Sequence, residues 1–542
     1  MSRKKELIIT ACILLFCFFS LLIVAGIIIS RPSFQSRLLA ELSKKVGYNI
    51  RASSIKISLQ HGIGIKIQKL YVQPKKKEFI FFCPKLFLNY KFSELIKGKL
   101  IPEAVILESP SLEIEKISSS GEKGFPKEKL LLVITQLPSV DIKDAAISIK
   151  PYEVRIKNTN LYVRRVSKKA IAVDLNLNVS LKNASFPVNA KGDLYADESG
   201  ELVARFDTEL KAFPLSCIKE EDIIVFLNGT AFAKFSLHAS VSKGIKTSGN
   251  IRIEKPDFLL IGTDSQKKEY KFPYLTVQFK GNYRKKELLF QPVIIASKGL
   301  NLNINSKLNL SKSSPLISLK VTSSQMNIAM FKKIFPSCLL PAWLEKRLFP
   351  IIKKGELKEI RFSLNGTPAQ LKHLDDPANR DVLSGSLLMD KLLLLPKGAR
   401  FPLSDIKGKL IFKSGNLFIK EINAKLSSSQ IKKADLLIKN IYFDSSRHYQ
   451  LFLKGRFDLK DLMAQLHMEF TPPALLKAVK DFKEVAGIMD ATVVCEYRES
   501  WKMPVFKNSS AHLSDIRIAY NKIPEPLFIK RCDFWIDTNG NF

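Results

Sequence analysis

The sequence predicts a mainly β protein: an N-terminal transmembrane helix followed by an elongated, twisted antiparallel β-sheet that forms a repeating groove, with a few short covering helices. Three observations lead to this fold class. Strands with alternating apolar and polar residues recur along the chain, few segments have helical periodicity, and one long uncharged run lies near the N-terminus. A strand with one apolar face needs a second layer or a ligand against that face.

The clearest predicted strand runs from Ile171 to Leu181. Its odd positions are all Ile, Val or Leu, and the residues between them are Ala, Asp, Asn or Ser. This period of two places the apolar side chains on one face of the strand. The alternation recurs at 63–67, 302–304, 360–364 and 417–419. The connections between most strands are too short for crossover helices, so the pairing is expected to be antiparallel.

Size and charge narrow the class of protein. At 542 residues the chain exceeds the size of one compact core, so several domains or an elongated repeat are expected. The 86 Lys and Arg against 51 Asp and Glu give a formal net charge of +35. This charge fits an outer face attracted to anionic lipid headgroups or nucleic acid. It also fits lysines that keep exposed strand edges from pairing. The sequence has no recognised nucleic-acid-binding module, so no nucleic-acid partner is predicted.

Residues 7–29 are predicted to form a transmembrane signal-anchor. As a helix, this uncharged run is about 34 Å long, which is enough to cross a bilayer. A cleaved signal peptide is the alternative, but its apolar region is normally only about 7–15 residues long and ends at a small-residue cleavage site. Arg3, Lys4 and Lys5 precede the run and predict a cytoplasmic N-terminus. The predicted membrane-anchor residues are Leu7, Ile8, Ile9, Leu14, Leu15, Phe16, Phe18, Phe19, Leu21, Leu22, Ile23, Val24, Ile27, Ile28 and Ile29.

Three short helices are expected beyond the anchor. Pro32 opens an amphipathic helix that Gly47 ends, and this helix suits either the membrane interface or the end of a sheet. A second helix, Pro341–Phe349, is expected to cap the apolar face of the sheet, with a gate for a ligand as the alternative. A third, Ala474–Ala486, has apolar residues at helical spacing and is followed by Gly487, so it is expected to be another cover.

Two stretches resemble a known family. Residues 49–116, with "NIRASSIKISLQHGIGIKIQKLYV" and then "PKLFLNYKFSELIKGKLIPEAVILESPSLEIEK", resemble the N-terminal module of AsmA-like proteins. Residues 332–371, "KKIFPSCLLPAWLEKRLFPIIKKGELKEIRFSLNGTPAQL", resemble the Pro-, Trp- and Leu-bearing insertion of the YhdP branch. The resemblance implies a bridge-like lipid-transfer protein. Such a protein is anchored in the bacterial inner membrane and crosses the periplasm toward the outer membrane, whose barrier it supports.

An internal repeat is visible near the C-terminus. Phe401–Phe418 aligns without a gap with Glu525–Phe542, and repetition of this kind predicts stacking along an axis. Because the later copy stops where the earlier one continues, the C-terminal edge is expected to be continued by another chain or by missing sequence. The predicted divisions are a tip and anchor (1–30), an AsmA-like module (31–116), groove repeats (117–321), a helical insertion and strand (322–374) and further groove repeats (375–542).

Catalytic chemistry is not evident in the sequence. There is no phosphate-binding loop, HExxH motif or nucleophile elbow, and the six histidines are dispersed. The seven cysteines include no C-x-x-C pair, so neither a zinc site nor a disulfide framework is indicated. No enzyme activity, catalytic residue, metal or cofactor is predicted.

The predicted function is therefore transport of a phospholipid, or a similar two-chain lipid, along an apolar groove from the inner membrane. Outer-membrane or periplasmic proteins are expected as further partners at the C-terminal edge. The alternative is a membrane-tethered periplasmic β scaffold that assists the assembly of outer-membrane proteins. The residues predicted to line the groove are Ile63, Ile65, Ile67, Leu175, Leu177, Val179, Leu302, Ile304, Leu410 and Phe412.

Overall fold

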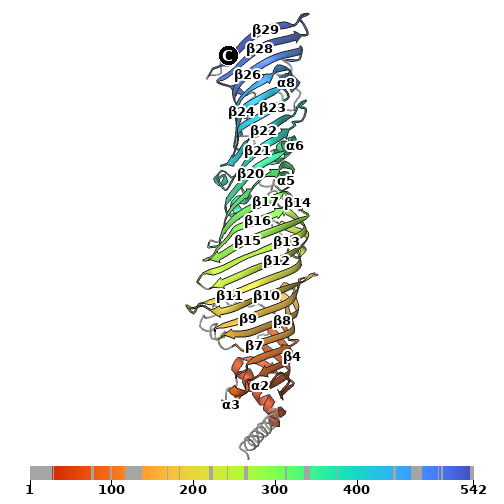
Figure 1. The fold of residues 1–542 in the computed structure, drawn as a ribbon, viewed down its shortest axis with the longest axis vertical. Coiled ribbons are helices and arrows are strands. Elements are labelled where there is room, and N and C mark those ends of the chain that lie inside the picture. Colours follow the sequence, from red (N-terminus) through yellow and green to blue (C-terminus); the bar gives the residue numbers. More distant parts are fainter. Residues whose placement is uncertain are drawn as a thin grey trace, which may run out of the picture. The chain divides into compact units, whose positions relative to one another are not determined.

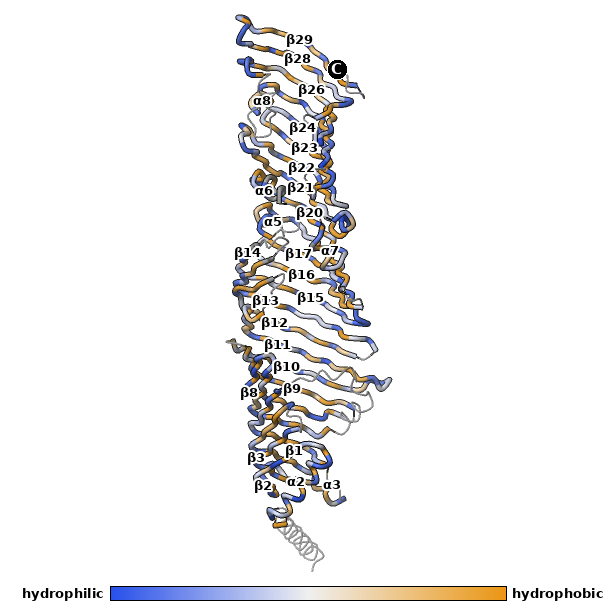
Figure 2. The backbone as a smooth tube through the Cα atoms, turned by 180° about the vertical axis from the view of Figure 1, so that it is seen from behind, coloured by the Kyte–Doolittle hydropathy of each residue, from blue (hydrophilic) through white to orange (hydrophobic). Residues whose placement is uncertain are grey.

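The protein is mainly β, as the alternating sequence predicts. The computed structural model describes residues 27–28, 30–74, 78–97, 101–115, 137–167, 169–181, 184–218, 224–240, 242–261, 267–311, 314–334, 342–374, 376–442, 447–465, 479–498, 500–501 and 504–537. Strands make up 69% of the structure and helices 12%. Apolar and polar residues alternate along the strands in both halves of the chain (Figure 2).

The chain divides into two compact units. Unit 1 comprises residues up to Cys217 together with Thr230–Arg252, and unit 2 comprises Ile218–Gly229 together with Ile253 onward. The division falls inside two long strands, β12 (Ile224–Ser240) and β13 (Gly244–Ile261).

Unit 1 is a succession of strands, with helices α2 and α3 beside the first of them (Figure 1). Its further elements are α2 (Pro32–Val46), β1 (Tyr48–Arg51), β2 (Ser54–Ser58), β3 (Gly64–Pro74), β4 (Phe79–Asn89), α3 (Phe92–Ile96), β5 (Ala104–Glu108), β6 (Ser111–Ile114), β7 (Ser139–Ile149), the 3₁₀ turn η1 (Lys150–Tyr152), β8 (Val154–Ser167), β9 (Ala170–Leu181), β10 (Ala184–Ala196), β11 (Leu202–Pro214) and the turn η2 (Leu215–Cys217).

Helix α2 has the bounds that the sequence predicts. Pro32 is its first residue, and Gly47 ends it in the left-handed conformation with φ 75°, donating its N–H to the Ser43 carbonyl. Glycine adopts this conformation without the steric cost that a Cβ adds, which explains why the helix stops there.

Two strand pairs in unit 1 depart from the expected antiparallel arrangement. β5 and β6 run in the same direction as β7 and pair with it in parallel, while both pair antiparallel with β4. Ser109, with φ 52°, marks the break between β5 and β6. The connection from β6 to β7 spans residues 115–138, long enough for the chain to return to the same direction. The prediction of antiparallel pairing was wrong for these two pairs.

Strand β9 contains the predicted strand 171–181, but its burial does not alternate. The expected water-facing residues Asp174, Asn178 and Ser180 are half-buried, as are Leu175 and Leu177. Strands β8 and β10 pair with β9 along most of its length. The neighbouring residues on these two strands reduce the exposure of the side chains on both faces of β9. The two faces of β9 are therefore less different than the sequence pattern indicates.

Unit 2 is a second succession of antiparallel strands, with helices α5 and α6 beside strands β17–β21 (Figure 1). Its elements are β14 (Lys267–Lys271), β15 (Tyr274–Arg284), β16 (Glu287–Ser297), β17 (Leu300–Asn309), β18 (Leu316–Ser323), β19 (Met326–Asn327), α5 (Ile328–Ile334), α6 (Ala342–Ile351), β20 (Ile352–Gly366), α7 (Pro368–Lys372), the turn η5 (Pro377–Asn379), β21 (Leu383–Leu394), β22 (Leu403–Lys413), β23 (Asn416–Leu426), β24 (Ser429–Lys439), β25 (His448–Asp458), α8 (Leu459–Ala464), β26 (Phe482–Arg498), β27 (Val505–Phe506), β28 (Ser509–Tyr520) and β29 (Leu527–Ile536).

The predicted helix over Ala474–Ala486 is wrong in its second half. Phe482–Ala486 belongs to strand β26, which pairs with β28, and residues 474–478 lie outside the described residues. Gly487, expected to end the helix, instead lies at a register shift between Ala486 and Ile488 with φ 131°. A glycine at an irregularity in a strand and a glycine after a helix look alike in sequence.

The predicted membrane anchor lies almost entirely outside the described residues, which include only Ile27 and Ile28 of that set. Every helix in the described part of the chain is too short or too polar to cross a membrane.

A buried carboxylate fixes α8 to the turn between β23 and β24. Asp461 is 5% exposed and accepts hydrogen bonds from the N–H groups of Ser428 (2.9 Å) and Ser429 (3.0 Å), and from their hydroxyls at 2.8 and 2.9 Å. Burial alone raises the pKa of this carboxyl, but the serine hydrogen bonds outweigh it and hold the pKa below its ordinary value.

Replacing Asp461 with Ala is expected to lower the free energy of unfolding by about 2 kcal/mol or more, because buried donors lose their acceptor. The lowered pKa means that the carboxylate stabilises the fold above the unfolded-state pKa, and this contribution disappears as pH falls through the folded-state pKa. Urea unfolding of the native protein and of Asp461→Asn is therefore expected to differ more at pH 7 than at pH 3. Asp490→Asn, at an exposed ion pair with Lys432, is the control. An equal difference at both pH values would contradict this assignment.

Candidate functional site

Unit 2 contains an apolar cavity of about 290 Å³ between its strands and the short helices α5 and α6. All of its lining residues except Gly385 and Ser386 are Leu, Ile, Val, Met or Phe. The lining residues are Leu302, Ile304, Leu319, Val321, Met326, Phe331, Ile334, Leu348, Phe349, Ile360, Phe362, Leu364, Leu383, Gly385, Ser386, Leu387, Leu410, Phe412, Leu417 and Ile441.

Strand register creates the floor of this cavity. Ile304 pairs with Val321, Val321 with Phe362, Phe362 with Gly385, Gly385 with Phe412, and Phe412 with Leu417. Residues that pair across antiparallel strands point to the same face of the sheet. An apolar row therefore crosses β17, β18, β20, β21, β22 and β23. With strands about 4.8 Å apart, its length is about 24 Å.

Gly385 makes room within the row. A Cβ atom built on this residue would lie 2.6 Å from the Phe362 ring and 3.1 Å from the Arg361 carbonyl oxygen. Because 2.6 Å is shorter than real Cβ contacts, the glycine allows the ring of Phe362 to lie across the neighbouring strand. A larger residue at this position would displace the aromatic floor of the cavity.

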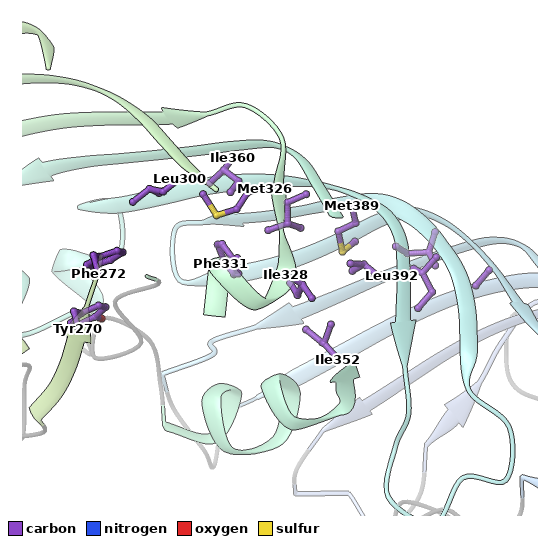
Figure 3. Packing of buried hydrophobic residues seen from close by; sticks show 14 residues of the cluster. Tyr270, Phe272, Leu300, Met326, Ile328, Phe331, Ile352, Ile360, Met389 and Leu392 are labelled. Atoms are coloured by element: carbon purple, nitrogen blue, oxygen red, sulfur yellow. The ribbon is translucent and has the colours of Figure 1, made fainter. Parts of the chain in front are cut away.

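Helices α5 and α6 cover one side of the row. Ile328 and Phe331 of α5 are 5% exposed and gather with Met326 and Ile360 against the strands (Figure 3). The rings of Phe331 and Phe349 meet edge to face with centroids 6.4 Å apart, which joins α5 to α6. The apolar face of the sheet is thus partly covered by the protein itself, and the cavity is the part left open beneath the helices.

Lys332 connects the two helices. Its ammonium group donates hydrogen bonds to the carbonyl oxygens of Phe349, near the end of α6, and Ile352, at the start of β20. Burial, together with the nearby charge of Lys353, lowers the pKa of Lys332. A cation at the end of a helix also interacts favourably with the helix dipole. Lys332 therefore holds α6 over the cavity.

Replacing Lys332 with Met is expected to lower the free energy of unfolding by about 1–3 kcal/mol, because the substitution keeps the alkyl chain but removes the donor to two carbonyl groups. Lys346→Met, at an exposed position of α6, is the matched control and is expected to change little. Chemical denaturation of both variants measures the difference. Equal unfolding midpoints for the two variants would show that Lys332 does not hold the helix.

The structure places the ten predicted groove residues in two different settings. Leu302, Ile304, Leu410 and Phe412 all line the cavity. The other six are half-buried in unit 1: Ile63 precedes β3, Ile65 and Ile67 lie in β3, and Leu175, Leu177 and Val179 lie in β9. These six do not line the cavity of unit 2.

Sequence reasoning missed several lining residues. Met326, Phe331 and Ile334 come from the short β19–α5 segment, where the spacing of Phe331 and Ile334 by three residues is the available helical signal. Ile441 follows β24 in a loop and is fully buried, and no sequence pattern indicates this. Leu348 of the expected covering helix does line the cavity, while the side chains of Trp343 and Leu344 lie outside the described residues.

The chemistry of the cavity is that of a hydrocarbon site. Its lining includes no ionisable side chain, and no group of three or more His, Cys, Asp or Glu within the described residues could hold a metal ion. No model of a known protein family matches the sequence, and no curated protein sequence matches it. The resemblance to AsmA-like proteins stays a prediction, and the functional argument depends on the cavity.

Proposed function

We propose that the protein binds the acyl chains of a lipid in the apolar cavity of unit 2. In this proposal it is an inner-membrane-anchored, non-catalytic carrier that moves phospholipid through the periplasm toward the outer membrane and so supports the outer-membrane barrier. The observation that carries the proposal is the apolar row from Ile304 to Leu417, which lines a cavity without any charged side chain.

The cost of moving lipid through water makes such a site useful. Each CH₂ group exposed to water costs about 0.8 kcal/mol, so one acyl chain costs on the order of 10 kcal/mol. Side chains of Leu, Ile, Val and Phe provide an apolar environment that removes most of this cost. The strands contribute their apolar faces, and the headgroup stays in water.

The dimensions of the site fit one hydrocarbon chain. Ligand pockets have volumes of about 300–1,000 Å³, and the cavity of about 290 Å³ lies at the lower limit of that range. One leaflet of a bilayer has a hydrocarbon depth of about 15 Å, and the apolar row of about 24 Å exceeds it. The cavity thus has room for one chain, and the row along its floor is long enough to contact that chain over its length.

The alternative function, a membrane-tethered scaffold for outer-membrane protein assembly, is favoured by strand β29. Phe528 and Trp535 on this strand are 74% and 67% exposed. Exposed apolar residues on a strand at the edge of a sheet favour pairing with another chain. A protein without bound lipid, but with a partner strand along β29, would fit this second function.

Leu387→Trp is expected to reduce the amount of co-purifying lipid severalfold, because the larger side chain fills the cavity that Leu387 lines. Native mass spectrometry of the detergent-solubilised full chain measures bound lipid directly. The matched control is Leu388→Trp on the same strand, because Leu388 is 40% exposed and does not line the cavity.

Thermal unfolding checks that both tryptophan variants fold. The proposal is contradicted if the native protein carries no lipid after mild solubilisation. It is also contradicted if Leu387→Trp and Leu388→Trp retain the same amount of lipid as the native protein.

A further inference from the structure

Helix α2 exposes apolar side chains at the first edge of unit 1. None of its residues is buried, and Phe34, Leu42 and Val46 are 41%, 40% and 52% exposed. Two polar side chains connect the helix to the strands. Gln35 donates a hydrogen bond from Nε2 to the Ile55 carbonyl at 2.8 Å, and the Ile50 N–H donates to Ser43 Oγ at 3.0 Å. The helix is therefore fixed to the sheet while part of its apolar stripe faces outward.

The β2–β3 and β4–β5 connections, at one end of these strands, also expose apolar side chains. Leu59, Phe92 and Ile101, here called the tip residues, are 59%, 44% and 64% exposed. Asn89 joins their loops, because its Nδ2 donates to the His61 carbonyl at 2.8 Å and its carbonyl accepts from the Glu103 N–H at 2.7 Å. The Asn89 side chain thus links the two connections.

Helices α2 and α3 lie next to each other at one end of unit 1 (Figures 1 and 2), and Phe92 is the first residue of α3. Scattered exposed apolar residues are common on proteins, but a concentration of them marks an interaction surface. The gathering of α2 and the tip residues therefore requires an apolar partner.

Charge around α2 points to an anionic membrane as that partner. Arg31, Arg37, Lys44 and Lys45 are exposed at α2, where Glu41 is the acidic residue. Around the tip residues, Lys91 and Lys97 are balanced by Glu94, which pairs with Lys97 at 3.1 Å, and by exposed Glu103, so the excess of basic charge belongs to α2. Basic residues next to exposed apolar side chains are the pattern by which helices bind the surface of anionic bilayers. The exposed residues Ile27 and Ile28 directly precede this surface in the chain.

We infer that α2 and the tip residues form a contact surface for an anionic lipid leaflet, with the apolar side chains among the lipids and the basic side chains at the headgroups. The inference rests on the membrane attachment in the proposed function, but not on lipid binding in unit 2. This contact sets the first strands directly on the bilayer, so that lipid leaving the leaflet meets protein rather than water.

Tryptophan reporters in the full chain test the inference. Leu59→Trp, Phe92→Trp and Ile101→Trp are reconstituted separately into vesicles of phosphatidylcholine and phosphatidylglycerol whose acyl chains carry bromine, a quencher of tryptophan emission. The control is Phe232→Trp on β12, because Phe232 is 37% exposed and β9, β10 and β11 separate β12 from β8. The tip reporters are expected to be quenched at least twofold more than the control. Quenching no greater than at position 232 would overturn the inference, and it is also the result expected if the surface binds a protein.

Reversing the charge of two basic residues tests whether the surface recognises anionic lipid. Arg37→Glu/Lys44→Glu in the Leu59→Trp background is expected to reduce quenching at least twofold, whereas Lys157→Glu/Arg164→Glu on β8 changes the net charge equally and is expected to have no effect. Equal effects of the two pairs, or equal quenching in phosphatidylcholine alone, would contradict recognition of anionic lipid. Co-purifying lipid, measured in parallel, separates this result from the proposed function. If the tip reporters are not quenched but the protein still carries lipid, only the membrane-contact surface is contradicted. If they are quenched but the protein carries no lipid, only the lipid-binding cavity is contradicted.

Discussion

Antiparallel register is the constraint on which the proposed site depends. Ile304, Val321, Phe362, Gly385, Phe412 and Leu417 come from strands spread over more than a hundred residues, and hydrogen-bonded pairing alone brings them into one row. A slip of one residue in any strand would turn its apolar side chains to the opposite face. Strand pairing thus creates the apolar row, and helices α5 and α6 cover one side of it.

Helices α5 and α6 determine how much of the apolar row is packed core and how much is open cavity. Residues of α5 pack on the strands as a conventional core, with Phe331 nearly fully buried, while the space between this core and the cluster around Ile441 stays open. An apolar cavity that excludes polar groups stays dry unless an apolar ligand enters it. Lys332 connects α5 to the end of α6 and the start of β20 through the backbone carbonyl groups of Phe349 and Ile352.

The sequence predicted the class of fold because period-two alternation is a local signal that pairing does not alter. It also selected Leu302, Ile304, Leu410 and Phe412, since an apolar residue on an alternating strand must face something apolar. It could not identify the parallel pairing at β7 or the strand irregularity at Gly487, because these depend on partners distant in sequence. Nor could it show that the residues of β9 are half-buried on both faces, since neighbouring strands determine that burial.

The same limits apply to the site. The closing residues Met326, Phe331 and Ile441 occupy short or irregular segments, where periodicity over a few residues carries little information. Helix α2 in unit 1 shows the reverse case, because the sequence pattern is enough to recognise it as amphipathic. Only the structure shows that its apolar residues are exposed, as are the tip residues Leu59, Phe92 and Ile101.

The most direct test of the central claim is photocrosslinking from within the row. Benzoylphenylalanine in place of Phe362 keeps an aromatic ring in the cavity, and the same group in place of Arg361 projects from the exposed opposite face of β20. After irradiation in cells, mass spectrometry of the purified protein is expected to show a phospholipid adduct at position 362 and none at 361. Adducts only to the protein's own residues at position 362, or equal lipid adducts at both positions, would contradict the account.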